Sequence, residues 1–355
     1  GWLNIYAASS SEAFESIFSF SQNYGKQVIW IGTSYILVFF IMSLDARLFS
    51  RLSYPLYGIL VLMLIGVLIF GTEIKGAKSW FTFGGFSIQP SEFAKFTTAL
   101  ALSYYLSGLR GKFSGIKSRL FSFAIIAVPP LLILLQPDTG SVLVYASFIF
   151  VLYREGLSGN VLLAGLALAV LFILALLLKQ TEIALPFDLV LRGKLILVLL
   201  IVGLGLAGYF LFKKIKGVKW LILSLVLVSS GYIYTVDYVF SNVLQEHQQN
   251  RINELLGIVN DPRGAGYNVT QSKIAIGSGG MWGKGFLQGT QTKYNFVPEQ
   301  STDFIFCTVG EEWGFVGSFV VIALFLTMLF RILQITERQR SDFARIYGYC
   351  VASIF

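Results

Sequence analysis

The sequence predicts an all-α, polytopic integral membrane protein with about ten or more transmembrane helices and one large extracytoplasmic loop. Of its 355 residues, 55% are hydrophobic and only 13% are charged, whereas soluble domains carry about 25% charged residues. The mean hydropathy is +0.71. Repeated apolar stretches are long enough to cross about 30 Å of hydrocarbon, which requires helices or a closed barrel.

The apolar stretches give the expected order of the helices. They lie at 26–44, 54–72, 90–108, 119–136, 139–153, 160–179, 195–212, 219–239, 303–332 and 342–355. The first twenty residues read as a loop and the last span runs to the final residue. We therefore expect one membrane domain over residues 1–355, trimmed at both ends.

The basic residues predict which loops face the cytoplasm. Fifteen of the 27 Lys and Arg residues fall in one set of short loops: Arg47, Arg51, Arg110, Lys112, Lys117, Arg119, Arg154, Lys213, Lys214, Lys216, Lys219, Arg331, Arg338, Arg340 and Arg345. The positive-inside rule assigns these loops to the cytoplasm. The loops that are then outside are residues 1–25, 73–89, 180–194 and 240–302. The net charge of +8 therefore mostly reflects membrane topology and does not indicate binding of nucleic acid.

Two neighbouring spans are short. The span 119–136 contains Pro129 and Pro130, and the sequence "LQPDTGS" joins it to 139–153. A helix broken near the outer face survives in lipid only where it is buried in protein or lines a wet cavity.

An acid and a base share one face of the helix that begins with "QPSEFAKF". Pro90 suits the first turn of a helix, and Ser91 is a candidate cap. Glu92 and Lys95 are three residues apart and therefore neighbours. One interpretation is an acid at a helix N-terminus that pairs with a neighbouring lysine at the membrane surface. The other is an ion pair that takes part in the function of the protein. We favour the functional pair, because ionisable residues inside an apolar helix are costly and usually face a cavity.

Other acids at the outer boundary have a simpler explanation. Asp138 and Asp303 each precede an apolar span and are expected to cap it. Glu311 and Glu312 lie deeper in the same span as Asp303, so at least one must find a partner or water. Cys307 and Cys350 are expected to pack in the core, and the lone His247 to be a loop residue.

The long outer loop, 240–302, holds the most unusual polar segment of the chain. Asp261 precedes Pro262, which suits a helix cap but also leaves a carboxylate free for chemistry. A short helix is expected to follow, carrying Gln271, Ser272 and Lys273. The segment "SGGMWGKG" lacks the pattern of a phosphate-binding loop and the GxGxxG fingerprint. Its glycines would instead permit tight turns or a close approach of backbone to a ligand.

Acids and bases thus gather at the outer face: Glu92, Lys95, Asp138, Arg251, Asp261, Lys273, Glu299 and Asp303. Such a mixture beside a bilayer suits a lipid-linked pyrophosphate. Cations hold phosphate, and a carboxylate can deprotonate a hydroxyl nucleophile.

Seven segments together resemble the SEDS family, the group of RodA and FtsW. They are "GAKSWF" (76–81), "QPSEFAK" (89–95), "QPDTG" (136–140), "QQNRI" (248–252), "DPRGAGYNVTQSKIAIGSGG" (261–280), "GKGFLQGTQ" (283–291) and "PEQSTDFIF" (298–306). The resemblance covers nearly the whole chain and is nearer to RodA than to FtsW. It implies ten transmembrane helices, against which 195–212 and 219–239 read as an additional pair.

The resemblance also implies an activity. The family polymerises lipid II into peptidoglycan glycan strands outside the bacterial cytoplasmic membrane, in cell elongation or division, with a class B penicillin-binding protein as the transpeptidase partner. The essential aspartate of its "DPxGxGY" motif corresponds to Asp261. We expect Asp261 to act as general base or to bind a divalent cation, Mg²⁺ or Mn²⁺. We expect the pyrophosphate or another part of the substrate to be bound by Glu92, Lys95, Arg251, Lys273, Gln271, Ser272 and Asp138.

Two alternatives remain at this point. A lipid II flippase would also use charges at membrane depth and broken helices, although no matching cluster of acids and bases lies at the cytoplasmic ends. A noncatalytic scaffold that activates a penicillin-binding protein would use the outer cluster as a docking surface. In that case Asp261 and Glu92 would tolerate Asn and Gln.

Overall fold

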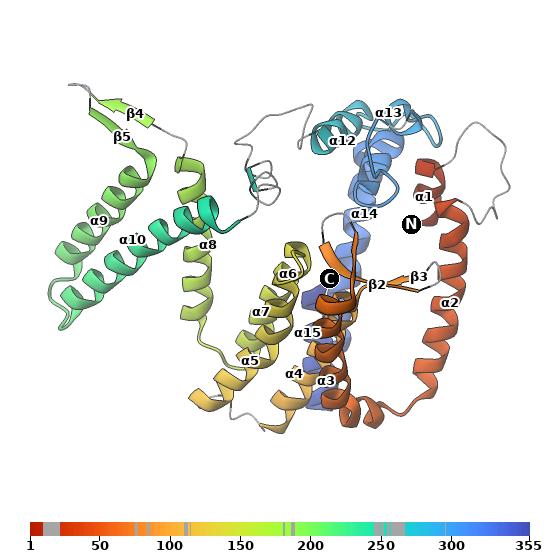
Figure 1. Cartoon of the computed structure of the whole chain (residues 1–355), viewed down its shortest axis with the longest axis horizontal. Helices are drawn as coiled ribbons and strands as arrows, with labels where there is room; N and C mark the ends of the chain where they lie inside the picture. The colour runs from red at the N-terminus through yellow and green to blue at the C-terminus, as the bar shows by residue number, and fades with distance from the viewer. Residues whose placement is uncertain are drawn as a thin grey trace. The chain divides into compact units, whose positions relative to one another are not determined.

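The computed structural model describes residues 1–9, 22–74, 77–83, 86–109, 113, 115–179, 182–185, 189–244, 249, 252–253, 256, 267–294 and 296–355, and helices dominate them. The longer helices are α2 (Asn23–Ser43), α3 (Ala46–Phe70), α4 (Pro90–Gly108), α5 (Ile116–Leu134), α8 (Gly159–Lys179), α9 (Gly193–Phe212), α10 (Val218–Asn242) and α14 (Ile305–Glu337). The shorter ones are α1 (Trp2–Ser9), α6 (Thr139–Ala146), α7 (Phe148–Arg154), α12 (Tyr267–Ser278), α13 (Thr290–Lys293) and α15 (Asp342–Ile354) (Figure 1).

The polytopic helical class is confirmed. Within the described ranges, 7 helices are long and apolar enough to cross a membrane. Most of their surface is not buried by protein: in α2 and α9 only 6% of the apolar window is buried. Helices that expose apolar residues on most sides are suited to lipid rather than water.

Every expected span contains a described helix. The spans 195–212 and 219–239 correspond to α9 and α10 and are already included in the ten spans read from the sequence. The expectation that they are additional to the family's ten helices stays a prediction.

Four local expectations also need correction. The span 139–153 is divided at Ser147 into α6 and α7. The first residues form α1 rather than a loop. Ser91 does not cap α4, because Gln89 is at the N-cap position without a side-chain bond. Asp303 does not cap α14, whose N-cap is Phe304, again without a side-chain bond.

Two of the connections that the sequence assigns to the outer face contain strands. β1 (Thr72–Ile74), β2 (Ala77–Phe83) and β3 (Phe86–Ile88) make an antiparallel sheet in the order β1-β2-β3. β4 (Glu182–Leu185) and β5 (Leu189–Arg192) form an antiparallel hairpin in which Glu182 is the Cα partner of Arg192.

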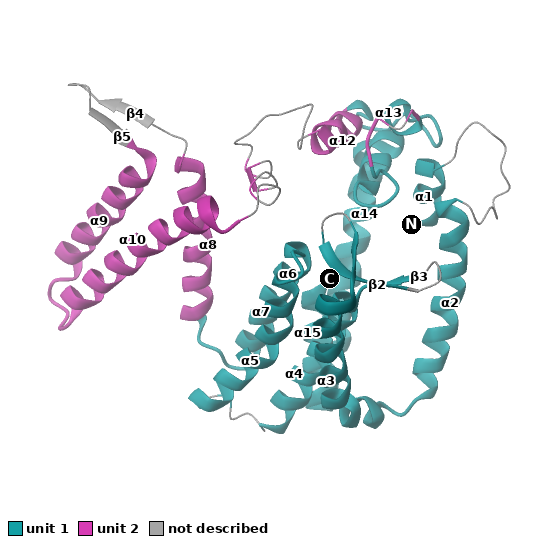
Figure 2. Ribbon diagram, viewed as in Figure 1, with its two compact units in different colours: residues 1–159, 278–293, 299–355 teal, residues 160–277, 294–298 magenta. Residues whose placement is uncertain are grey.

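The chain divides into two units, which Figure 2 shows in different colours. Unit 1 comprises residues 1–159, 278–293 and 299–355, and unit 2 comprises residues 160–277 and 294–298. Within unit 1, α4 is the central helix, because it packs against α3, α5, α6 and α15. Within unit 2, α9 packs against α10, and a second apolar cluster includes Leu176, Leu197 and Ile233.

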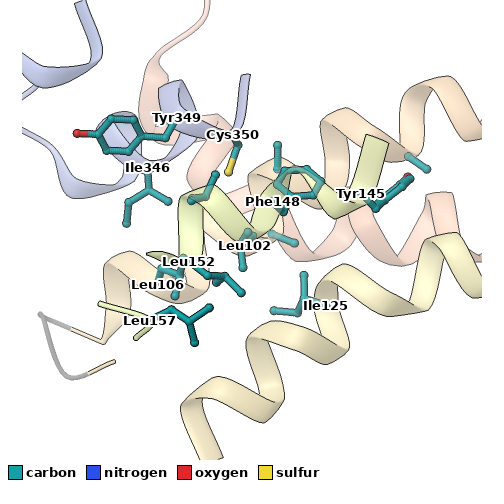
Figure 3. Close-up of a cluster of buried hydrophobic side chains, with 14 of the residues drawn as sticks. Leu102, Leu106, Ile125, Tyr145, Phe148, Leu152, Leu157, Ile346, Tyr349 and Cys350 are labelled. Carbon is teal, nitrogen blue, oxygen red and sulfur yellow. The ribbon is translucent and has the colours of Figure 1, made fainter. Parts of the chain in front are cut away.

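The core of unit 1 joins α4, α5, α6, α7 and α15. Leu102, Phe148 and Cys350 are completely buried in it, and Figure 3 shows them with their neighbours. Cys307 and Cys350 are both free and buried, which confirms that they are packing residues. This core fixes α4 along its length and so determines where its outer end lies.

Candidate active site

The N-terminal end of α4, which the sequence predicts to face outside, is packed against protein on one side. Pro90 is the first helical residue, where its missing N–H removes no hydrogen bond. Ser91, Ala94, Thr97 and Thr98 are all buried. One side of the first turns of α4 is therefore packed in protein, while the side chain of Glu92 remains exposed.

Glu92 and Lys95 form an ion pair on this end. The Lys95 ammonium donates to both carboxylate oxygens of Glu92, at 2.9 and 2.8 Å. The side chain of Lys95 is 17% exposed and that of Glu92 is 55% exposed. The cation is thus the more enclosed member, and its carboxylate partner fixes the direction in which it points. The structure brings these two predicted site residues together.

Asp138 joins the outer ends of two helices. Its carboxylate accepts from the backbone N–H of Ser141 at 3.2 Å and from the Ser141 hydroxyl at 2.7 Å, and so caps α6. It also accepts from the side-chain amide of Gln89 at 2.9 Å, immediately before α4. The capping expected for Asp138 is confirmed. Through Gln89 the same side chain helps to position the start of the helix that carries Glu92 and Lys95.

The predicted helix of the long loop is present as α12. The Ser272 hydroxyl is buried and donates to the carbonyl of Val269 at 2.8 Å. Gln271 is half-buried and Lys273 is exposed. These three residues belong to unit 2, whereas Glu92, Lys95 and Asp138 belong to unit 1. Asp261, Arg251 and His247 lie outside the described residues, so their predicted roles stay predictions.

The glycines after α12 bring two stretches of backbone together. A Cβ on Gly279 would lie 1.9 Å from the carbonyl oxygen of Gly310, and one on Gly283 would lie 2.1 Å from that of Glu312. Only glycine permits such an approach. Gly279 and Gly283 therefore permit close contact with α14, while Gly280, Gly283 and Gly285 have positive φ, as expected for tight turns.

The facing part of α14 is interrupted at Gly314, which has a φ of 64°. The N–H groups of Phe315 and Val316 donate instead to the carbonyls of Gly280 and Met281, at 2.9 and 3.2 Å. In the other direction, the N–H of Lys284 donates to the carbonyl of Glu311 at 3.0 Å. The loop thus satisfies backbone groups that the break in the helix would otherwise leave unpaired.

Glu311 lies at the centre of this contact and is completely buried. Its carboxylate accepts from the Lys284 ammonium at 2.7 Å and from the backbone N–H groups of Gln291 and Thr292, at 2.8 and 2.9 Å. The Thr290 hydroxyl adds a contact at 3.3 Å. The expectation that Glu311 or Glu312 must find a partner is confirmed. Sequence reasoning missed that Lys284 is that partner, although a lone lysine among glycines was the available signal.

Glu312 is the second buried acid of this pair. One oxygen accepts from the backbone N–H of Leu287 at 3.1 Å, and Leu287 has a positive φ of 62°. The carboxylate therefore holds the loop in a conformation that a leucine rarely adopts. Both acids thus bind the loop to α14, Glu311 through both carboxylate oxygens and Glu312 through one, while the other oxygen of Glu312 is buried without a hydrogen-bond partner.

The described residues do not assemble a metal site. No group of three His, Cys, Asp or Glu side chains is present among them. Both oxygens of Glu92 are engaged by Lys95, and those of Glu311 by donors of the loop. Within the part of the chain that the structure places, neither carboxylate has the free, clustered oxygens that Mg²⁺ or Mn²⁺ prefers.

Comparison with known proteins decides the family. The FtsW/RodA/SpoVE family model, described as a cell cycle protein, matches residues 1–185 and 191–355. The chain belongs to this family. The matched ranges include α9 and α10.

Relatives within the FtsW/RodA/SpoVE family are similar over most of the chain. The peptidoglycan glycosyltransferase RodA of Treponema pallidum is 34% identical over 349 residues, which cover 94% of this chain and 78% of the relative. The peptidoglycan glycosyltransferase MrdB of Escherichia coli K12 is 30% identical over 322 residues, covering 90% and 70%. The SEDS resemblance and its nearness to RodA are confirmed, and these names support the expectation of a glycosyltransferase.

Solved structures share the fold. The rod shape determining protein RodA of Thermus thermophilus aligns with a TM-score of 0.55 and 21% identity, covering 99% of this chain and 76% of that protein. A chain of a peptidoglycan synthase complex that coordinates polymerisation and crosslinking aligns with a TM-score of 0.59 and 24% identity, covering 100% and 79%. Both establish a common multi-pass helical fold for the family.

Proposed function

We propose that this chain is a peptidoglycan glycosyltransferase that polymerises lipid II on the outer face of the bacterial cytoplasmic membrane during cell elongation. The observation that carries the proposal is the mostly enclosed Lys95, paired with the exposed Glu92 at the N-terminal end of the central helix, in a chain whose relatives are named for this activity. A cation held at the edge of the membrane suits the pyrophosphate of a lipid-linked sugar.

The reaction we propose is a single inverting displacement. The 4-hydroxyl of an acceptor lipid II attacks the anomeric carbon of the lipid-linked glycan. The bond from that carbon to the pyrophosphate oxygen breaks, and undecaprenyl pyrophosphate leaves with the bonding electrons. Asp261 accepts the hydroxyl proton, a contribution worth about 10²–10⁴-fold when a base is well placed.

The remaining predicted residues have supporting roles in this proposal. Lys95 offsets the charge of the leaving pyrophosphate, and Glu92 orients Lys95 through its two hydrogen bonds. Arg251, Lys273, Gln271 and Ser272 contact the donor or acceptor. Asp138 acts through Gln89 by holding the start of α4. A divalent cation, if the enzyme uses one, would be held by Asp261, and none of these steps depends on it.

We further propose a class B penicillin-binding protein as the partner that crosslinks the new strands. In support, one neighbour of the same fold belongs to a complex that coordinates polymerisation and crosslinking. By the positive-inside topology, the loops that include β1–β3 and α12 would face the compartment in which such a partner works.

The test is synthesis of glycan strands from labelled lipid II by the purified protein. Reactions would run with and without a co-purified class B partner, and with EDTA, Mg²⁺ or Mn²⁺. Asp261→Asn and Asp261→Ala would be compared with wild type, with folding checked by size exclusion. Long strands from wild type and none from folded Asp261 variants support the proposal.

The other outcomes have distinct meanings. Strands that persist in both variants would leave a polymerase in which Asp261 has no chemical role. An absence of strands in every condition, with the partner present, favours the flippase or the scaffold. Lipid II translocation in vesicles would then distinguish these two, because only the flippase moves lipid II across the bilayer.

A further inference from the structure

Unit 2 contains a polar pocket that the proposed reaction does not use. It has a volume of about 340 Å³ and lies where the end of α8, the start of α9 and the last turns of α10 meet. Its polar lining residues are Lys179, Arg192, Lys194, Asp237 and Ser241. By the positive-inside topology, this end of the three helices faces outside, at the level of lipid headgroups.

The charges of this pocket do not balance. The ammonium groups of Lys179 and Lys194 both contact Asp237, at 3.2 and 3.0 Å, and Lys179 also donates to the Ser241 hydroxyl at 2.6 Å. Arg192 also lines the pocket, so its described lining residues include three cations and one carboxylate.

The local helix geometry makes this imbalance more costly. Arg192 is the N-cap of α9 and Lys194 lies in its first turn, where the helix dipole disfavours cations. The N-cap makes no side-chain hydrogen bond, and the first turn carries no acidic residue. Gly193 allows the backbones to approach closely, since a Cβ there would lie 1.8 Å from the carbonyl oxygen of Leu178. The start of α9 is thus fixed beside Lys179 with an excess of positive charge.

We propose that this pocket binds the phosphate group of a membrane lipid. An anion would neutralise the excess charge and would meet the positive end of α9 as well as three cationic donors. The side chains of Lys179, Lys194 and Asp237 are 28–31% exposed, so the pocket is accessible from the headgroup layer. The simpler alternative is that Asp237 only ties the three helices together.

The test is lipid binding measured by native mass spectrometry on the full protein in detergent. The probes are phosphatidylglycerol, undecaprenyl pyrophosphate and, as a phosphate-free control, diacylglycerol. Arg192→Gln is the main variant, because Arg192 makes no ion pair among the described residues and its loss does not disturb the links to Asp237. It is expected to weaken binding of the phosphate lipids about fivefold.

Two further variants separate the site from general charge effects. Lys214→Gln removes the same charge from the basic α9–α10 connection, on the opposite side of the membrane, and is expected to leave binding unchanged. Asp237→Asn raises the net charge of the pocket and is expected to strengthen binding. A merely structural network predicts weaker folding of Asp237→Asn and no gain in lipid binding.

The result also identifies the source of the phosphate. Loss confined to undecaprenyl pyrophosphate identifies a lipid of the polymerisation cycle, and loss with both lipids identifies a general site for anionic lipids. Equal effects of Arg192→Gln and Lys214→Gln, or no effect of either, would overturn the proposal. Because binding is measured without turnover, a failure of the glycosyltransferase proposal would leave this result intact.

Discussion

At the scale of single residues, Lys95 has an unusual position. Its side chain is mostly enclosed, yet its ammonium is bound by a carboxylate that is itself more than half exposed. A surface ion pair of this kind contributes little to stability. We therefore infer that the pair orients the Lys95 ammonium rather than stabilising the fold.

We predict that Lys95→Gln lowers the rate of lipid II polymerisation by about 10–100-fold, because a charge-assisted hydrogen bond to the pyrophosphate is lost. Glu92→Gln is expected to have a smaller effect, since an amide oxygen can still accept from Lys95. Initial rates of strand synthesis would measure both. Thermal unfolding should show no change for either variant, and a lower unfolding midpoint with unchanged rates would contradict the assignment.

Glu311 is the opposite case, a completely buried carboxylate whose partners are all structural. Glu311→Ala leaves Lys284 and two backbone N–H groups without their acceptor. We predict a loss of about 3–5 kcal/mol, typical of breaking a buried pair, visible as a lower unfolding midpoint in detergent. Glu337→Gln is the matched control, because its pair with Arg154 is exposed at both ends.

The sequence indicated some of these residues better than others. Glu92 and Lys95 could be paired because helix spacing alone makes residues three apart neighbours. Asp138 could be recognised as a cap for the same local reason. The bond between Lys284 and Glu311 joins residues far apart in sequence, and local spacing contains no information about such a contact. Local spacing was misleading for Asp303, which was expected to cap the following helix but does not cap α14.

At the scale of elements, the contact between the glycine-rich loop and α14 is the least tolerant feature. Gly283 combines a φ of 81° with a Cβ position that would clash with the backbone of Glu312. We predict that Gly283→Ala costs about 2–4 kcal/mol, from left-handed strain and overpacking together. Proteolysis of the loop in the purified protein would measure this.

The control for that substitution is Gly277→Ala, two residues before the contact begins. No atom lies within 4 Å of a Cβ at that position, and Gly277 is part of α12. Alanine should be neutral or stabilising by up to about 1 kcal/mol. Equal sensitivity of the two glycines to alanine would show that the loop does not depend on this backbone contact.

The sequence predicted the positions of helices where hydropathy alone determines them, but not features that depend on contacts between distant segments. Each apolar stretch read from the sequence contains a described helix, and 7 of the described helices are long and apolar enough to cross a membrane. Hydropathy did not reveal the break of α14 at Gly314, which persists because backbone from another segment replaces the lost helical bonds. Nor did it reveal the strands of the outer connections, which carry no strong alternating pattern.

At the scale of the whole molecule, the basic loops define a topology that can be tested directly. We predict that Trp282→Cys, at a position 79% exposed in the outer loop, reacts with a membrane-impermeant maleimide in intact spheroplasts. Lys214→Cys should react only after permeabilisation. The native cysteines are buried and provide a low background. Labelling of Lys214→Cys in intact spheroplasts would show that the predicted topology is the wrong way round and that the loop containing Trp282 faces the cytoplasm.

Family and fold class could be inferred for the whole molecule because the motifs recur in order along the entire chain. The arrangement of the predicted site could not. Glu92 and Lys95 belong to one unit and Lys273 to the other, and Asp261 lies outside the described residues. The chemistry therefore follows from residue types and from the family, whereas the geometry is established only for the α4 end and for the loop on α14.

The break in α14 has a consequence for how the protein is made. The ribosome completes the outer loop before it reaches residues 310–316, so the loop is translocated before its backbone partners exist. Gly280, Met281 and Lys284 can form their bonds only after the outer part of α14 has been synthesised and inserted. A chain arrested before that point would expose an unfolded outer loop. Formation of this loop–helix contact thus has to wait for a helix that is synthesised after the loop.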